Sequence, residues 1–139
     1  MNMADQFDLI AEAKSGALSV RMSPEEFARI DHECRRFVKE TIREVQNDMR
    51  EISKIDKWGF GDHPDSKLTS APTMARRFRE KAMGQPDGND FYTILEEHKS
   101  AVESIRQLFG AMRDRYIAQD STLAARFKAE SERLGNPIK

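Results

Sequence analysis

Few side chains in this sequence have the type and spacing needed for chemistry. Cys34 is the single cysteine, and it lies among apolar residues at helical spacing, where a thiol is more often an inert packing group than a nucleophile. The histidines His32, His63 and His98 lack the spacing of metal ligands. His63 has an aspartate on either side and could hold a cation, although a solvated polar turn is the more common arrangement. We expect no catalytic residue, no metal site and no cofactor.

The charge pattern argues against a nucleic-acid partner. Lys and Arg total 23 against 24 Asp and Glu, which gives a formal net charge of −1. Nucleic-acid-binding proteins normally carry a basic excess or a basic stripe. One local basic cluster, Arg76, Arg77 and Arg79, could contact phosphate or an acidic partner, but a solvated helix face is the more common explanation. The glycine pair at Gly59 and Gly61 is not followed by the Lys-Ser/Thr of a phosphate-binding loop.

The length and hydropathy pattern indicate one small helical assembly. A chain of 139 residues suits a single domain, with too little sequence for two full cores. No run approaches the roughly 18 consecutive apolar residues of a membrane span, so we expect none. The first eight residues have neither the basic region nor the apolar region of a Sec signal peptide.

A long helix is predicted to begin at Ser23. Ser23 can cap it, Pro24 suits the first helical position, and Glu26 completes a capping box. Apolar residues then recur at steps of three and four, and no Gly or Pro interrupts them before Gly59. This pattern predicts one amphipathic helix of about 32 residues, roughly 48 Å long. Its apolar positions are Phe27, Ile30, Cys34, Phe37, Val38, Ile42, Val45, Met49 and Ile52.

A second long helix is predicted from Phe91, with its apolar residues alternating at steps of four and three. Such spacing predicts an unbroken seam over about 26 residues. The seam consists of Phe91, Leu95, His98, Val102, Ile105, Phe109, Met112 and Tyr116, and Ile94, Ala101 and Leu108 widen the apolar face beside it. Shorter helices are expected at about 4–14, 71–82 and 122–134, separated by Gly- and Pro-bearing turns.

These elements predict an all-α fold. Two long stripes of similar length, joined by a middle section, indicate an antiparallel helical hairpin. Because the apolar face is wider than one partner helix covers, we expect two hairpins to pair into a four-helix bundle, with a self-covered monomer as the alternative. We expect an N-terminal arm with a short helix at 1–22, a hairpin domain with a short middle helix at 23–120, and an amphipathic C-terminal tail at 121–139.

Two features near the ends of the long helices point to a family. Trp58, the single tryptophan, is followed by Gly59 and Gly61, and it could plug the end of a bundle. Tyr116 precedes Asp120 by four residues, which would place the hydroxyl and the carboxylate on one helical face. Together they resemble the WXG superfamily of helical-hairpin proteins exported by type VII (ESX) secretion systems. The turn here is Trp-Gly-x-Gly and the chain is longer, as in a divergent or ESX-associated member.

The resemblance implies a non-enzymatic protein that is exported as a folded dimer. The partner would be a second copy or a related hairpin, and the secretion ATPase would recognise a composite signal made of Trp58, Gly59, Gly61, Tyr116 and Asp120. The protein would be cytoplasmic before export and then secreted or held in the cell envelope, by a Sec-independent route. We expect Tyr116→Ala to abolish export and leave the fold intact.

Two other classes of function remain open from the sequence. A cytosolic helical adaptor or chaperone would hold a larger partner, such as an exported toxin, and would not leave the cell. A small enzyme or ligand binder would need convergent polar groups on its apolar faces, where only His98 and Cys34 qualify.

Overall fold

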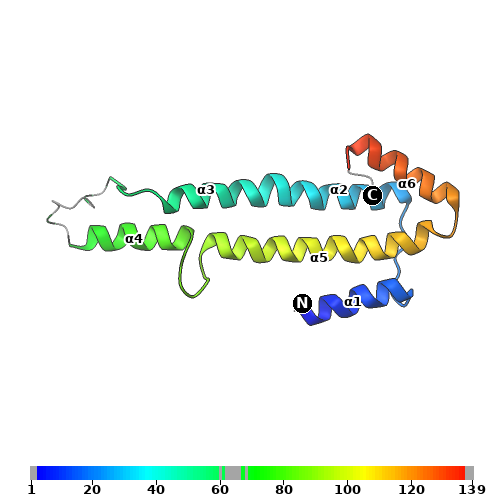
Figure 1. The fold of residues 1–139 in the computed structure, drawn as a ribbon, viewed down its shortest axis with the longest axis horizontal. Helices are drawn as coiled ribbons and strands as arrows, with labels where there is room; N and C mark the ends of the chain where they lie inside the picture. Colours follow the sequence, from blue (N-terminus) through cyan, green and yellow to red (C-terminus); the bar gives the residue numbers. More distant parts are fainter. Residues whose placement is uncertain (1–2, 60, 62–66, 68, 137–139) are drawn as a thin grey trace. The chain divides into compact units, whose positions relative to one another are not determined.

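The structure is a computed structural model that describes residues 3–59, 61, 67 and 69–136 (Figure 1). The described residues form helices and connecting turns and contain no strand, so the all-α prediction is confirmed. The elements, in chain order, are α1 (Met3–Ser15), α2 (Pro24–Arg36), the π-helical segment η1 (Phe37–Ile42), α3 (Arg43–Ser53), α4 (Ser70–Ala82), α5 (Phe91–Ile117) and α6 (Ser121–Leu134).

The first long helix begins as its sequence predicts. The backbone N–H of Glu26 donates to Ser23 Oγ at 3.1 Å, and the backbone N–H of Ser23 donates to Glu26 Oε2 at 2.9 Å. This reciprocal pair confirms the predicted capping box. Helical residues then continue without a break to Ser53. The π-helical turn at η1, which adds about one residue to an α-helical turn, was not predicted.

The second long helix, α5, begins after a buried aspartate. Asp90 is almost fully buried, and its carboxylate accepts hydrogen bonds from the backbone N–H of Thr93 at 3.0 Å and from the Thr93 hydroxyl at 2.9 Å. Burial raises the pKa of Asp90, but these hydrogen bonds outweigh it and hold the pKa below its ordinary value. The Asp90 carboxylate therefore fixes the start of the predicted seam helix.

Two compact units make up the chain. The first combines Met1–Val38 with Ser100–Lys139, and the second is Lys39–Lys99. The expected segments 1–22, 23–120 and 121–139 stay a prediction, as does the pairing of the long helices into a hairpin.

The first unit has a small core shared by four helices. Its buried members are Ala13, Phe27, Ala111 and Met112, against which Leu18, Met22, Leu108, Phe109, Tyr116 and Phe127 pack. In Figure 1, α6 lies beside α2, and the side chain of Asn136 joins them by donating to the Ala28 carbonyl at 3.2 Å. Asn136 Oδ1 also lies 2.9 Å from His32 Nδ1. Because Phe127 packs against this core, part of the apolar side of the expected C-terminal tail is covered within its own unit.

The second unit packs α3 against α4 and the first part of α5. Ile42, Ala71, Ala75 and Ala82 are its buried apolar residues. Gln46 is buried, and its amide donates to the Tyr92 carbonyl at 3.3 Å and to Glu96 Oε2 at 2.8 Å. Arg50 donates to the Tyr92 hydroxyl at 2.8 Å. Polar contacts therefore fix α3 against α5 where large apolar side chains are few.

Candidate functional site

The Trp-Gly turn is anchored within the second unit. The Trp58 indole N–H donates to the Ile55 carbonyl at 3.1 Å, and its ring centroid lies 5.7 Å from that of Phe78 on α4. Arg79 donates to the carbonyls of Ile55 and Asp56, each at 3.3 Å, and so satisfies backbone groups just beyond the end of α3. Trp58 is half-buried, whereas Phe78 is 49% exposed.

The two turn glycines adopt a conformation that favours glycine. Gly59 and Gly61 have φ of +83° and +85°, in the left-handed region that side chains with a Cβ rarely adopt. Phe60 and the suggested cation ligands His63, Asp62 and Asp65 lie outside the described residues.

Tyr116 and Asp120 do not share a helical face, so that part of the prediction is wrong. Helix α5 ends at Ile117, and Asp120 has an extended backbone (φ −155°, ψ 131°). The Asp120 carboxylate accepts the backbone N–H of Thr122 at 2.7 Å and caps α6. Aspartate is favoured at the N-cap of a helix and disfavoured in a helix interior. This preference explains why α5 ends before Asp120 and α6 begins after it.

Tyr116 also has a structural role that its spacing did not predict. Its ring packs in the core of the first unit, with its centroid 5.9 Å from that of Phe27. Truncation to alanine would remove this packing, so the expectation that Tyr116→Ala leaves the fold intact is not supported by these contacts.

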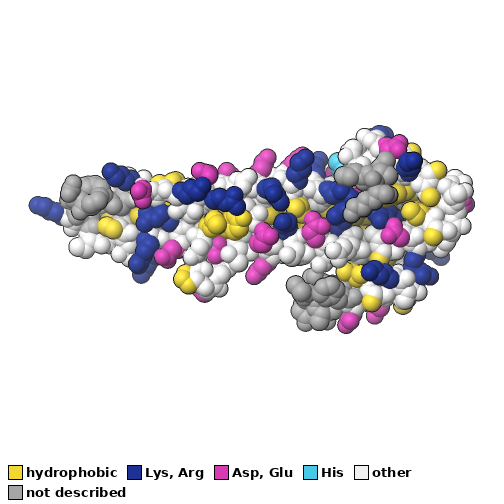
Figure 2. All heavy atoms as spheres, in the orientation of Figure 1, with side chains coloured by type: hydrophobic (Ala, Val, Ile, Leu, Met, Phe, Trp, Pro, Cys, Tyr) yellow, Lys and Arg dark blue, Asp and Glu magenta, His cyan; other side chains and the backbone are white. Residues whose placement is uncertain are grey.

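The predicted seam is only partly buried. Met112 is buried, and Leu95, Val102 and Phe109 are half-buried, whereas Phe91 is 53% exposed, Ile105 is 48% exposed and His98 is exposed. On the first long helix, Phe37 and Val45 are exposed as well. Figure 2 shows hydrophobic side chains at the surface among the charged ones. Several large apolar side chains of the long helices are therefore only about half covered within the described chain.

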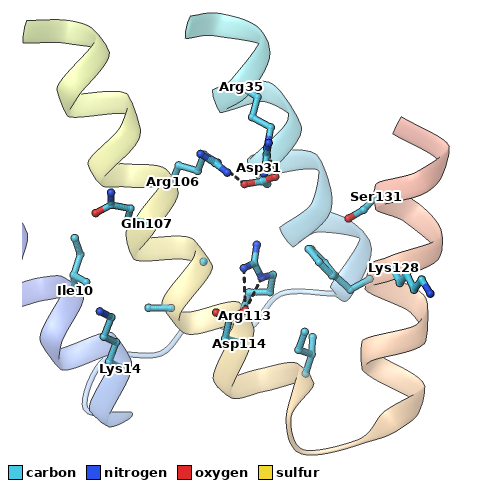
Figure 3. Close-up of a pocket in the computed structure, with 14 residues that line it drawn as sticks. Ile10, Lys14, Asp31, Arg35, Arg106, Gln107, Arg113, Asp114, Lys128 and Ser131 are labelled. Atoms are coloured by element: carbon cyan, nitrogen blue, oxygen red, sulfur yellow. Dashed lines mark hydrogen bonds and ion pairs between the residues drawn. The ribbon is translucent and has the colours of Figure 1, made fainter. Parts of the chain in front are cut away.

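The first unit contains an ion cluster around a buried aspartate that the sequence did not predict. Asp31 is 8% exposed, and its two carboxylate oxygens accept hydrogen bonds from Arg35 Nε and Arg106 Nε, both at 2.7 Å. Figure 3 shows the two guanidinium groups converging on Asp31 from α2 and α5. The available signal was that Asp31 follows Phe27 by four residues and so shares its helical face. Its partner Arg106, far along the sequence, left no comparable signal.

The electrostatics of this cluster favour the charged forms of Asp31 and its arginine partners and keep the Cys34 thiol unreactive. Burial raises the pKa of Asp31, but the hydrogen bonds from Arg106 and Arg35 outweigh it, so its pKa lies below the ordinary value. Burial, aided by the negative charge of Asp31, raises the pKa of the Cys34 thiol. A raised thiol pKa lowers the thiolate fraction at neutral pH and argues against nucleophilic catalysis by Cys34.

A groove of about 590 Å³ lies beside this cluster (Figure 3). Residues from α1, α2, α5 and α6 line it, all within the first unit. Its polar lining consists of Lys14, Asp31, Arg35, Arg106, Gln107, Arg113, Asp114, Lys128 and Ser131.

Neither a metal cluster nor a membrane span is found in the part of the chain that the structure describes. No three or more His, Cys, Asp and Glu side chains gather there as metal ligands would. None of the helices described is both long and apolar enough to cross a membrane.

Comparison with protein-family models, with curated proteins and with solved structures finds no match.

Proposed function

We propose that this chain is a non-enzymatic helical interaction protein that pairs with a second helical protein and is exported with it by a type VII secretion system. The observation that supports pairing is the exposure of large apolar side chains on both long helices, most clearly Phe91 and Ile105. Fully burying such a side chain is worth about 1.5–3 kcal/mol, so covering the exposed half of each favours association by about 1 kcal/mol.

The partner that fits these residues is another apolar helical surface, either a second copy or a related hairpin. Phe91 and Ile105 belong to a pattern with steps of four and three, which is the spacing of helix-to-helix seams. In the proposed arrangement each chain forms a hairpin and two hairpins pair into a four-helix bundle.

Pairing is tested by adding a charge to the seam. Ile105→Glu places a carboxylate on the exposed apolar position, and Ser100→Glu on the same helix serves as the matched control because Ser100 is an exposed polar residue. We expect the wild type and the control to elute as a dimer in size exclusion with light scattering, and Ile105→Glu as a monomer. If the wild type is monomeric, a related helical protein encoded by a neighbouring gene is co-expressed and tested as the partner. If the wild type forms neither a homodimer nor a complex with that protein, the pairing is contradicted.

The export signal is proposed to include Trp58, Gly59, Gly61, Tyr116 and Asp120, as in the family that the chain resembles. The contacts decide which substitutions test it cleanly. Tyr116→Phe keeps the ring that packs on Phe27 and removes only the hydroxyl. Asp120→Asn keeps an N-cap oxygen for Thr122 and removes the charge.

The experiment compares export of the wild type with these two variants in the native host. Culture filtrate, envelope and cytosol are probed together with a cytosolic lysis marker, and circular dichroism verifies that the variants stay folded. We expect the wild type outside the cell and the folded Tyr116→Phe/Asp120→Asn double variant retained inside. Export of the double variant at the wild-type level would refute the role of these two groups.

The adaptor function stays the second candidate because the same exposed apolar residues would serve it. It predicts that the wild type itself is retained in the cytosol in a stable complex with a larger protein. Fractionation of the wild type alone therefore distinguishes the two proposals before any variant is made.

A further inference from the structure

The groove beside the Asp31 cluster has the dimensions of a small-molecule site. Its volume of about 590 Å³ falls within the range of about 300–1,000 Å³ that is typical of ligand pockets. Four helices of one compact unit contribute to it, so its lining does not depend on the placement of the other unit. Neither the Trp-Gly turn nor Asp120 lines it.

Positive charge predominates in the lining. Five cationic side chains face two carboxylates, those of Asp31 and Asp114. Asp31 is fully engaged by Arg35 and Arg106, and Glu103 lies 3.3 Å from Arg106 as a further counter-charge. The ammonium groups of Lys14 and Lys128 pair with no carboxylate among the residues that the structure describes.

Arg113 combines a positive charge with an aromatic surface. Its guanidinium carbon lies 4.8 Å from the Phe127 ring centroid, and its Nη2 lies 2.9 Å from Asp114, a neighbour in sequence whose side chain is largely exposed. Stacking on Phe127 holds the guanidinium in place, while an exposed counter-ion can be exchanged for a ligand anion.

The lining also holds an unsatisfied hydroxyl and an apolar part. Ser131 is buried, and its Oγ has no hydrogen-bond partner among the described residues, an arrangement that normally costs free energy. The apolar lining is supplied by Ile10, Ala111, Ile117 and Phe127. Cations, an unpaired hydroxyl and an apolar surface together match a ligand that has both an anionic and an apolar part.

We propose that this groove binds a small phosphate-bearing molecule with an aromatic body. The phosphate lies against Arg113 and Lys14, and the aromatic part lies against Ile117 and Phe127. Phosphate suits the site because its several charged oxygens accept hydrogen bonds from cations that come from different helices. Binding would add a ligand-dependent function to a protein whose proposed role is association and export.

The test uses two probes that differ only in the aromatic part, inorganic phosphate and phenyl phosphate. Isothermal titration calorimetry of the full chain at physiological ionic strength measures both. We expect saturable binding of phenyl phosphate, about tenfold or more tighter than that of inorganic phosphate because the ring is buried against apolar side chains. Equal affinities, or no saturable binding of either probe, would overturn the proposal.

Three variants separate a built site from general attraction of anions. Lys14→Gln with Arg113→Gln removes two lining charges, and the affinity for phenyl phosphate should fall about tenfold or more. Lys57→Gln removes an exposed charge in the other unit and should change the affinity less than about twofold. Gly110→Leu keeps every charge and fills the groove, so it should also abolish binding of phenyl phosphate. Wild-type affinity in the folded Gly110→Leu variant, verified by circular dichroism, would place the ligand elsewhere and overturn the proposal.

Discussion

Replacing Asp31 by asparagine should destabilise the protein far more than any exposed charge change. The carboxylate accepts two hydrogen bonds from charged groups at 2.7 Å, from Arg35 and Arg106. Asparagine has a single acceptor oxygen and no charge, so one guanidinium loses its hydrogen bond to residue 31 and the other loses the charge assistance.

The magnitude follows from the number of hydrogen bonds and from burial. A hydrogen bond to a charged group contributes about 1.5–3 kcal/mol to stability. The side chains of Arg35 and Arg106 are 27% and 24% exposed, so water recovers part of the loss. We expect Asp31→Asn to lower the free energy of unfolding by about 2–3 kcal/mol at neutral pH, which lowers Tm by roughly 6–12 °C for a chain of this size.

Urea denaturation followed by circular dichroism measures this loss, and its pH dependence checks the cause. The pKa of Asp31 in the folded chain lies below its ordinary value of 3.8. The unfolded state therefore binds more protons between the two pKa values, and stability falls as the pH drops through the folded pKa. The gap between wild type and Asp31→Asn should be full above about pH 5 and should shrink as the pH falls below about 4.

Two further variants make this test specific. Glu33→Gln breaks an exposed pair with Arg36 at 3.8 Å, and it should cost less than about 0.5 kcal/mol. A double-mutant cycle of Asp31→Asn with Arg106→Gln should give a coupling energy of about 1–2 kcal/mol. A loss below about 1 kcal/mol at neutral pH, or a loss that is unchanged at pH 3, would refute the reasoning.

Two glycines and the cysteine give further predictions. Gly110→Ala should raise stability by about 0.5–1 kcal/mol, because Gly110 lies inside α5 and its added Cβ makes only ordinary contacts; thermal unfolding measures this. Gly16→Ala should lower stability by about 1 kcal/mol or more, since φ is +87° and the Cβ would lie 2.5 Å from Arg115. Cys34 should react with a thiol reagent at pH 8 more slowly than free cysteine, because burial raises its pKa, and reaction at the free rate would contradict this.

Local signals in the sequence predicted the helices well. Ser23 and Glu26 form the predicted capping box, and the helices expected near 4–14, 71–82 and 122–134 occur as α1, α4 and α6. These features depend on residues within a few positions of one another, such as caps, glycines and apolar steps of three and four. The bounds of these helices can therefore be predicted from short stretches of the sequence alone.

Long-range contacts and burial were not predictable in the same way. The pairing of Asp31 with Arg106 joins residues that are far apart in sequence, and no local rule selects one arginine among many. Tyr116 looked like a surface signal because its spacing to Asp120 is helical, but the helix ends between them. The seam residue Ile105 has the pattern of a core position and is half exposed, because a pattern records which face is apolar and not what covers it.

The π-helical turn at Phe37–Ile42 allows one helix to contain two apolar patterns that are out of phase. Before it the apolar pattern ends with Cys34 and Phe37 and would continue at positions 41 and 44. After it the apolar residues are Val38, Ile42 and Val45, each one residue later than positions 37, 41 and 44 of the old pattern. The one extra residue of a π turn absorbs this offset, and Phe37 is 45% exposed while Val38 is 8% exposed. Deleting Lys39 should therefore restore a plain α-helix in which both patterns share a single phase.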